Sequence, residues 1–142
     1  MQASRQQKSV MMALAPESVP RLAAAVEGRY DLHWPHSVMQ AQAMLEHRHI
    51  DLVICGVLFD DSRMLDLLQY CKSSERLARI PFVGVRARRG RLPIDSLRDL
   101  VVASSALGAS GFVDFEQWVR ALGEAEATLQ MQRLVDGLLG EA

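Results

Sequence analysis

The hydrophobic positions of this chain fall into five short runs, separated by longer segments with a helical spacing. The runs at residues 10–14, 52–55 and 81–85 are almost continuously apolar, which is typical of strands buried on both faces of a parallel sheet. Shorter strand candidates lie at residues 30–35 and 108–115. The pattern therefore predicts five strands that alternate with helices.

The segments between the strands carry helix signals. In residues 38–49 the apolar side chains recur on one helical face, and Ser37 stands where a helix N-cap is expected. Residues 60–62, "DDS", are predicted to form the start of the next helix. From residue 116 to the end the chain is predicted as helix, interrupted by Gly123 and Gly137.

Buried strands between amphipathic helices imply an α/β fold with a doubly wound, five-stranded parallel sheet and an extended C-terminal helix. In such folds, ligands and chemistry gather at the carboxyl ends of the strands. These ends fall near Leu14, Gly56, Arg86 and Phe115. Gly56 has no side chain, and we expect it to accommodate an unusual backbone angle or to open a shallow ligand cavity.

Composition limits the classes of function. The chain has 142 residues, enough for one domain, and 49% of them are hydrophobic and 23% charged. The net charge of −1 disfavours nucleic acid and anionic membranes as partners. No apolar run approaches the roughly 20 residues of a membrane-spanning helix, and no signal peptide is recognisable. Cys55 and Cys71 form no disulfide or zinc pattern, so the expected location is a reducing cytoplasm.

Three stretches resemble the receiver domain of bacterial response regulators. "HIDLVICGV" is similar to the third strand of that family, "RLARIPFVGVRA" to the approach to its fourth strand, and "GASGFVDF" to its fifth. The resemblance covers about residues 8–125 in order and spacing. It implies the CheY-like receiver topology, which is flavodoxin-like, and a role in two-component signal transduction.

Most residues that carry the chemistry of the family are missing from this chain. The resemblance places the acidic magnesium-binding pair within residues 13–15, "ALA", and the phosphoacceptor aspartate at Gly56. It places the switch threonine or serine at Arg86 and the lysine of the fifth strand at Phe115. The switch aromatic is retained, as Phe112.

These losses remove the basis for phosphorylation on aspartate. Magnesium prefers carboxylate oxygens as ligands, and phosphoryl transfer to aspartate needs that carboxylate as its nucleophile. We therefore expect a pseudo-receiver that works by protein–protein contact, without cofactor, metal site or enzymatic activity. No cysteine or acidic residue completes a convincing metal set with His33, His36, His47 and His49.

Two alternatives stay open. The loop after the fourth strand contains Arg86, Arg88, Arg89 and Arg91. This cluster could bind a small anionic ligand or a nucleotide at the strand ends, which would make the chain a sensor. Alternatively, Asp60 or Asp61 could be a displaced phosphoacceptor, because a folded loop could bring either carboxylate back towards Gly56.

The predicted interaction surface lies near the last helix and the helix before the fifth strand, at Arg98, Trp118 and Arg120. The expected partner is a protein in a signalling pathway, with a second copy of this chain as one option. The predicted divisions are a polar tail at 1–8, a receiver-like domain at 9–125 and a C-terminal helical extension at 126–142. The extension could pack on the domain or mediate assembly.

Overall fold

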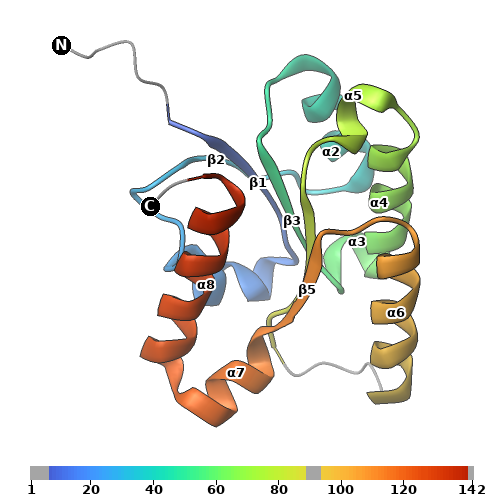
Figure 1. Cartoon of the computed structure of the whole chain (residues 1–142). Helices are drawn as coiled ribbons and strands as arrows, with labels where there is room; N and C mark the ends of the chain where they lie inside the picture. The colour runs from blue at the N-terminus through green and yellow to red at the C-terminus, as the bar shows by residue number, and fades with distance from the viewer. Residues whose placement is uncertain (1–6, 89–93, 141–142) are drawn as a thin grey trace, which may run out of the picture.

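The computed structural model describes residues 7–88 and 94–140, which contain one five-stranded sheet (Figure 1). All neighbouring strands are parallel, and their order across the sheet is β2-β1-β3-β4-β5. The strands are β1 (Ser9–Ala13), β2 (Asp31–His33), β3 (Leu52–Gly56), β4 (Phe82–Arg86) and β5 (Gly111–Asp114). This topology confirms the predicted doubly wound parallel sheet.

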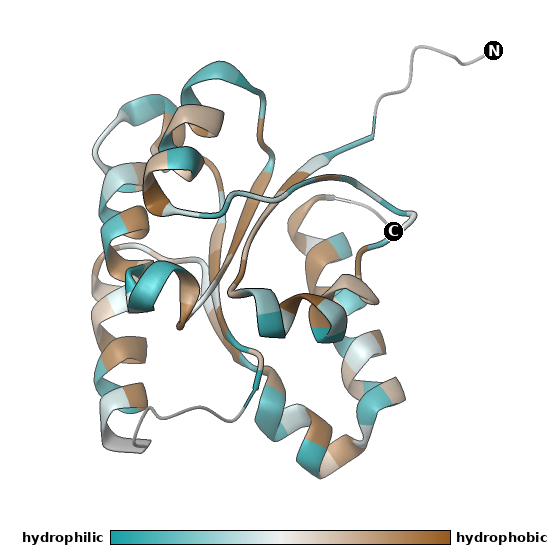
Figure 2. Cartoon of the chain, turned by 180° about the vertical axis from the view of Figure 1, so that it is seen from behind, coloured by the Kyte–Doolittle hydropathy of each residue, from teal (hydrophilic) through white to brown (hydrophobic). Residues whose placement is uncertain are grey.

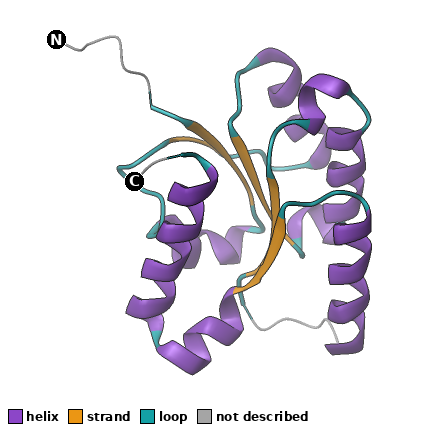
Figure 3. Ribbon diagram, viewed as in Figure 1, coloured by secondary structure: helices purple, strands orange, loops and turns teal. Residues whose placement is uncertain are grey.

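Helices cover both faces of the sheet, as Figure 3 shows. They are η1 (Pro16–Ser18), α1 (Val19–Ala23), α2 (Val38–His47), α3 (Phe59–Ser62), α4 (Met64–Lys72), α5 (Glu75–Ala78), α6 (Ile94–Ala106), α7 (Phe115–Leu122) and α8 (Glu124–Leu138). Helices α1 and α8 pack on one face, and α2, α4 and α6 on the other. Within residues 7–88 and 94–140, no helix is long and apolar enough to cross a membrane.

Both faces of the central strands are buried, which explains their nearly continuous apolar sequence. Met12 and Ile54 lie in the core under α1 and α8, whereas Met11 and Val53 lie in the core on the opposite face. This alternation follows from the pleat of a strand, in which successive side chains point to opposite faces. In Figure 2 the hydrophobic residues of the helices are turned mainly towards the sheet.

The segment after β3 differs from the prediction. Asp60, Asp61 and Ser62 have φ angles of 48°, 56° and 64°, so they do not form a regular helix start. The predicted start is therefore wrong here. Asp60 instead caps another helix, because its Oδ2 accepts a 2.8 Å hydrogen bond from the backbone N–H of Val38 in α2. Ser37 caps the same helix, as predicted.

The C-terminal segment is folded onto the domain. Gly123, with a φ of 89°, divides the predicted long helix into α7 and α8. Ala127, Met131 and Val135 of α8 are buried in the core on the side of α1. The segment after α7 therefore covers one face of the sheet. The predicted division of the chain at residue 126, which falls inside α8, stays a prediction.

The last turns of α8 are attached to the segment after α1 by an acidic residue. The carboxylate of Asp136 accepts hydrogen bonds from the guanidinium of Arg29 and the hydroxyl of Tyr30. The hydrogen bond from Arg29 holds the pKa of Asp136 below its usual value. A carboxyl group with a lowered folded-state pKa stabilises the fold above its unfolded pKa of about 4, and this contribution is lost as the pH falls through the folded-state pKa.

We therefore expect Asp136→Asn to lower the free energy of unfolding at neutral pH, and the difference from the unchanged chain to shrink below about pH 4. Urea unfolding across this pH range measures the effect. Glu126→Gln is the matched control, because the Glu126 carboxylate contacts Gln130 of its own helix. A loss of stability that does not vary with pH would contradict the assigned role of Asp136.

Candidate functional site

The carboxyl ends of the strands meet at one edge of the sheet, where the space over Gly56 is filled by Leu14. A Cβ atom added to Gly56 would lie 3.4 Å from Cδ2 of Leu14, the residue directly after β1. Both residues are buried. Gly56 is a regular residue of β3 and does not have a positive φ, so the expected unusual backbone angle is wrong. The side chain of Leu14 closes the position instead.

Very little space is left beside Gly56. A cavity of about 10 Å³ lies among Gly56, Ala15, Val57 and Ala87. This is about the volume that one water molecule needs. A small ligand does not fit there, which contradicts the expected ligand cavity at Gly56. In the described part of the chain, no group of three or more His, Cys, Asp or Glu residues is placed to hold a metal ion.

Phe115, at the lysine position of the resemblance, belongs to the core. Its side chain is fully buried on the face covered by α1 and α8. The ring of Trp118 lies beside it, with the two centroids 6.4 Å apart and the planes inclined by 52°. A tilted pair at this distance is a favourable aromatic arrangement. This position therefore contributes packing and no charge to the sheet edge.

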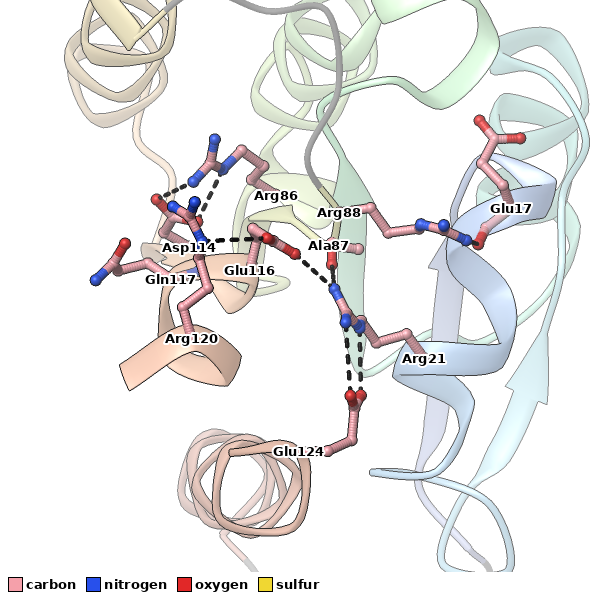
Figure 4. Close-up of polar contacts among 10 residues, drawn as sticks. All are labelled: Glu17, Arg21, Arg86, Ala87, Arg88, Asp114, Glu116, Gln117, Arg120 and Glu124. Atoms are coloured by element: carbon pink, nitrogen blue, oxygen red, sulfur yellow. Dashed lines mark hydrogen bonds and ion pairs between the residues drawn. The ribbon is translucent and has the colours of Figure 1, made fainter. Parts of the chain in front are cut away.

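Arg86 is held in an ion pair by a residue of the neighbouring strand. Its Nε and Nη2 donate to the two carboxylate oxygens of Asp114 at 2.8 and 3.0 Å (Figure 4). Arg86 and Asp114 are register partners in β4 and β5. Asp114 also accepts a hydrogen bond from the backbone N–H of Gln117 and so caps α7. Asp114 thus engages one edge of the guanidinium and offsets its positive charge, which weakens the attraction of Arg86 for an anion.

Arg21 of α1 joins three other elements at the same edge. Its Nη1 donates to the carbonyl of Ala87 at 3.0 Å and to Glu116 of α7 at 2.7 Å. Its Nε donates to Glu124 of α8 at 3.2 Å (Figure 4). Partial burial lowers the pKa of Arg21, but the hydrogen bonds to the two glutamates raise it above its usual value. Arg21 therefore stays charged and ties α7 and α8 to α1.

Of the arginine-rich loop, Arg86 and Arg88 lie within the described residues, and Arg89 and Arg91 lie outside them. Arg88 is exposed and its Nη1 donates to the carbonyl oxygen of Glu17 at 2.9 Å. Arg86 is paired with Asp114. Anion binding by this loop stays a prediction.

The cysteine next to Gly56 is not an available nucleophile. Cys55 is fully buried in the core under α2 and α4. Burial raises the pKa of its thiol well above the usual value. The thiolate is the reactive form of cysteine, so Cys55 is inert at neutral pH.

Phe112, the retained aromatic, is seated over a glycine of the neighbouring strand. A Cβ atom added to Gly84 would lie only 2.8 Å from Cδ2 of Phe112 and 3.0 Å from the sulfur of Met64. Gly84 and Phe112 are register partners in β4 and β5. The absence of a side chain at Gly84 therefore makes the slot that the ring occupies.

We expect Gly84→Ala to displace the ring of Phe112 and to lower the free energy of unfolding by about 1–3 kcal/mol, as overpacking in a core does. Chemical denaturation measures the loss, and the methyl resonance of Met64 reports the movement of the ring. Gly111→Ala is the matched control, because a Cβ atom there has no neighbour within 4 Å. Equal free energies of unfolding for the two variants would contradict this prediction, because they would mean that the ring of Phe112 moves aside without loss of stability.

The three predicted interface residues do not form one cluster of free side chains. Arg98 is exposed on α6. Trp118 is half-buried and packs against the core, so it is not a free anchor. Arg120 is exposed on α7, with its Nε 3.7 Å from Glu116. Their predicted role in partner binding stays a prediction.

The sequence places Leu14 at a strand end but does not show that its side chain covers Gly56, and it assigns no role to Arg21 or Asp114. For Asp114 a signal was present, because residues at the ends of neighbouring parallel strands face one another and Arg86 carries the opposite charge. The local sequence of Arg21 is that of a solvated helix residue, and nothing in it points to the sheet edge.

No protein-family model and no curated protein matches the sequence. Solved structures do match the fold. The phosphorylated cyanobacterial phytochrome response regulator RcpA aligns with 94% of both chains at 16% identity and a TM-score of 0.69. A response regulator from Hahella chejuensis aligns with 93% of this chain and 95% of its own at 13% identity and a TM-score of 0.70.

The receiver domain of a sensor histidine kinase from Pseudomonas aeruginosa also matches, in a structure with a magnesium ion coordinated in its active site cleft. It covers 96% of this chain and all of its own, at 14% identity and a TM-score of 0.65. These likenesses span almost the whole chain. The chain therefore has the fold of the response regulator receiver domains.

Proposed function

We propose that this chain is a signalling module that uses the receiver fold to contact a protein partner and takes no phosphoryl group on aspartate. The contact between Leu14 and Gly56 carries the proposal. Where the resemblance expects a phosphoacceptor carboxylate, the chain has a buried glycine, with a leucine methyl group 3.4 Å from the place of its Cβ atom. Position 56 therefore offers no side chain that could act as the nucleophile of phosphoryl transfer.

The charges around this edge support the same proposal. Phosphoryl transfer requires cations that spread the charge of the transition state. Arg86 is neutralised by Asp114, and Arg21 is held by Glu116 and Glu124. These arginines act as internal ties between elements. The edge is thus better suited to hold the fold in one arrangement than to respond to a phosphoryl group.

A displaced phosphoacceptor at Asp60 or Asp61 has less support. Asp60 is engaged by the backbone of Val38 and lies 3.4 Å from the guanidinium of Arg63. Asp61 is exposed and, with Asp60 and Glu17, lines a cavity of about 310 Å³ over Leu14 whose described lining contains no lysine or arginine. Within the described residues these carboxylates do not form a group that could hold a metal ion.

Incubation of the full chain with acetyl phosphate and Mg²⁺, followed by intact mass measurement, tests the proposal. We expect no covalent adduct. We also expect beryllofluoride with Mg²⁺ to leave the amide resonances of Phe112 and its neighbours unchanged. An aspartate-containing receiver domain treated in the same way is the positive control.

A stoichiometric adduct would overturn the proposal. Asp60→Asn and Asp61→Asn would then locate it, since loss of the adduct in one variant identifies that residue as a displaced acceptor. An adduct that survives both changes would point to another nucleophile.

A further inference from the structure

We propose that the groove between α4 and α6 receives an amphipathic segment of the protein partner, with apolar side chains in the groove and a lysine or arginine beside Asp99. This inference rests on the proposed function and names the surface and the chemistry of the partner. The groove has a volume of about 410 Å³, and Val57, which also borders the small cavity beside Gly56, lies at its inner end.

The groove exists because one face of α6 carries small residues opposite α4. Ser96, Asp99, Leu100 and Ala103 line it, at the i, i+3, i+4 and i+7 positions of one helical face. The short side chains of Ser96 and Ala103 cannot reach α4, so the two helices leave a gap between them. Leu65 lines the gap from the side of α4.

The apolar residues of the groove are incompletely covered. Leu65 and Leu100 are half-buried, although Leu67, Leu68 and Leu97 on the same two helices are buried. A cavity of about 150 Å³ already holds a benzene ring, so the groove has room for about two leucine- or phenylalanine-sized side chains. A partner that covers the accessible parts of Leu65 and Leu100 removes apolar surface from water, which favours its binding.

An acidic side chain at the groove favours a partner segment that carries a positive charge. Asp99 is exposed, and its carboxylate forms no ion pair with a residue of the described chain. Among the described residues that line the groove there is no lysine or arginine, and the neighbouring Asp66 is already paired with Arg63 at 2.9 Å. A cation on the partner therefore meets a carboxylate that no described residue of the lining neutralises. Helical segments that lay an apolar face into a groove between helices and place a charge at its rim bind in this way.

Selection of a randomised peptide display library on the immobilised full chain tests the inference. We expect the enriched peptides to share two large apolar residues about one helical turn apart and a lysine or arginine next to them. A synthetic peptide of the enriched sequence should shift the amide resonances of Leu65, Asp99 and Leu100 in the ¹⁵N-labelled chain. Asp99→Lys and Ala103→Trp should each weaken its binding at least about tenfold, a change worth about 1.4 kcal/mol.

Matched variants separate the possible results. Ser105→Lys, at an exposed position of α6 outside the groove lining, should leave binding unchanged. Binding that Arg98→Ala abolishes and Asp99→Lys spares would overturn the inference and favour the other face of α6. No enriched peptide, enrichment of acidic peptides, or self-association that accounts for all binding would also overturn it. None of these outcomes depends on the acetyl phosphate experiment, so the groove and the lack of phosphorylation can fail separately.

Discussion

Replacing Phe115 with lysine is expected to lower the free energy of unfolding by at least about 4 kcal/mol, which is a large part of the roughly 5–15 kcal/mol that stabilises an ordinary domain. The change restores the residue that a phosphorylated receiver would carry, but it does so inside the core. Phe115 is fully buried and packs beside Trp118. The variant loses this packing and must bury an ammonium group without a partner. Urea unfolding followed by circular dichroism measures the loss.

Phe115→Leu is the matched control, because it changes the shape of the side chain and adds no charge. We expect it to cost about 1–3 kcal/mol, less than the lysine variant. A lysine variant as stable as the leucine variant would contradict the burial of this position. It would mean that the lysine reaches water at the edge of the sheet, where it could serve phosphorylation after all.

Gly56→Asp is expected to lower the free energy of unfolding by about 2–4 kcal/mol at neutral pH and to produce no phosphorylated protein. The cavity beside Gly56 is only about 10 Å³, and Leu14 occupies the space above it. A carboxyl group placed there is desolvated, which raises its pKa in the folded chain. A raised folded-state pKa makes the variant lose stability as the pH rises, so the penalty should be smallest in acid. Urea unfolding at several pH values and intact mass after acetyl phosphate treatment measure both effects.

Gly56→Ala separates the charge from the size of the new side chain. Its Cβ atom would lie at ordinary contact distances, 3.4 Å from the flexible end of Leu14 and 3.9 Å from backbone atoms of Ala13 and Leu14, so we expect a change within about 1 kcal/mol. Adding Leu14→Ala to Gly56→Asp opens the space and should recover part of the stability. A stable Gly56→Asp variant that accepts a phosphoryl group would show that the site is open, and the proposed function would then be wrong.

The strand pattern could be predicted because it depends on local chemistry. A parallel strand covered on both faces must be apolar at successive positions, and residues 10–14, 52–55 and 81–85 show this. The helix ends were harder, because Asp60 satisfies the backbone of Val38, 22 positions away, rather than that of its own helix. Capping side chains of this kind signal a turn but do not reveal which helix they serve.

The sequence alone showed which residues of a receiver phosphorylation site this chain does not carry. Gly56 and Phe115 stand where an aspartate and a lysine would be needed, and side-chain chemistry alone excludes phosphoryl transfer at these two positions. The ion pair of Arg86 could not be predicted from the sequence in this way. A free arginine attracts anions, but in the fold Asp114 engages one edge of the guanidinium, through Nε and Nη2.

The sequence by itself determined the α/β class, the number of strands and their order along the chain, and the lack of a carboxylate at position 56. These features depend on residue type and periodicity. Only the tertiary structure decided that Leu14 closes over Gly56, that Arg21 ties α1 to α7 and α8, and that a groove stays open between α4 and α6. The contacts of Arg21 join residues 66 and 103 positions apart. Such contacts depend on how the helices sit on the sheet, and this arrangement is set by the packing of the whole core rather than by any local pattern.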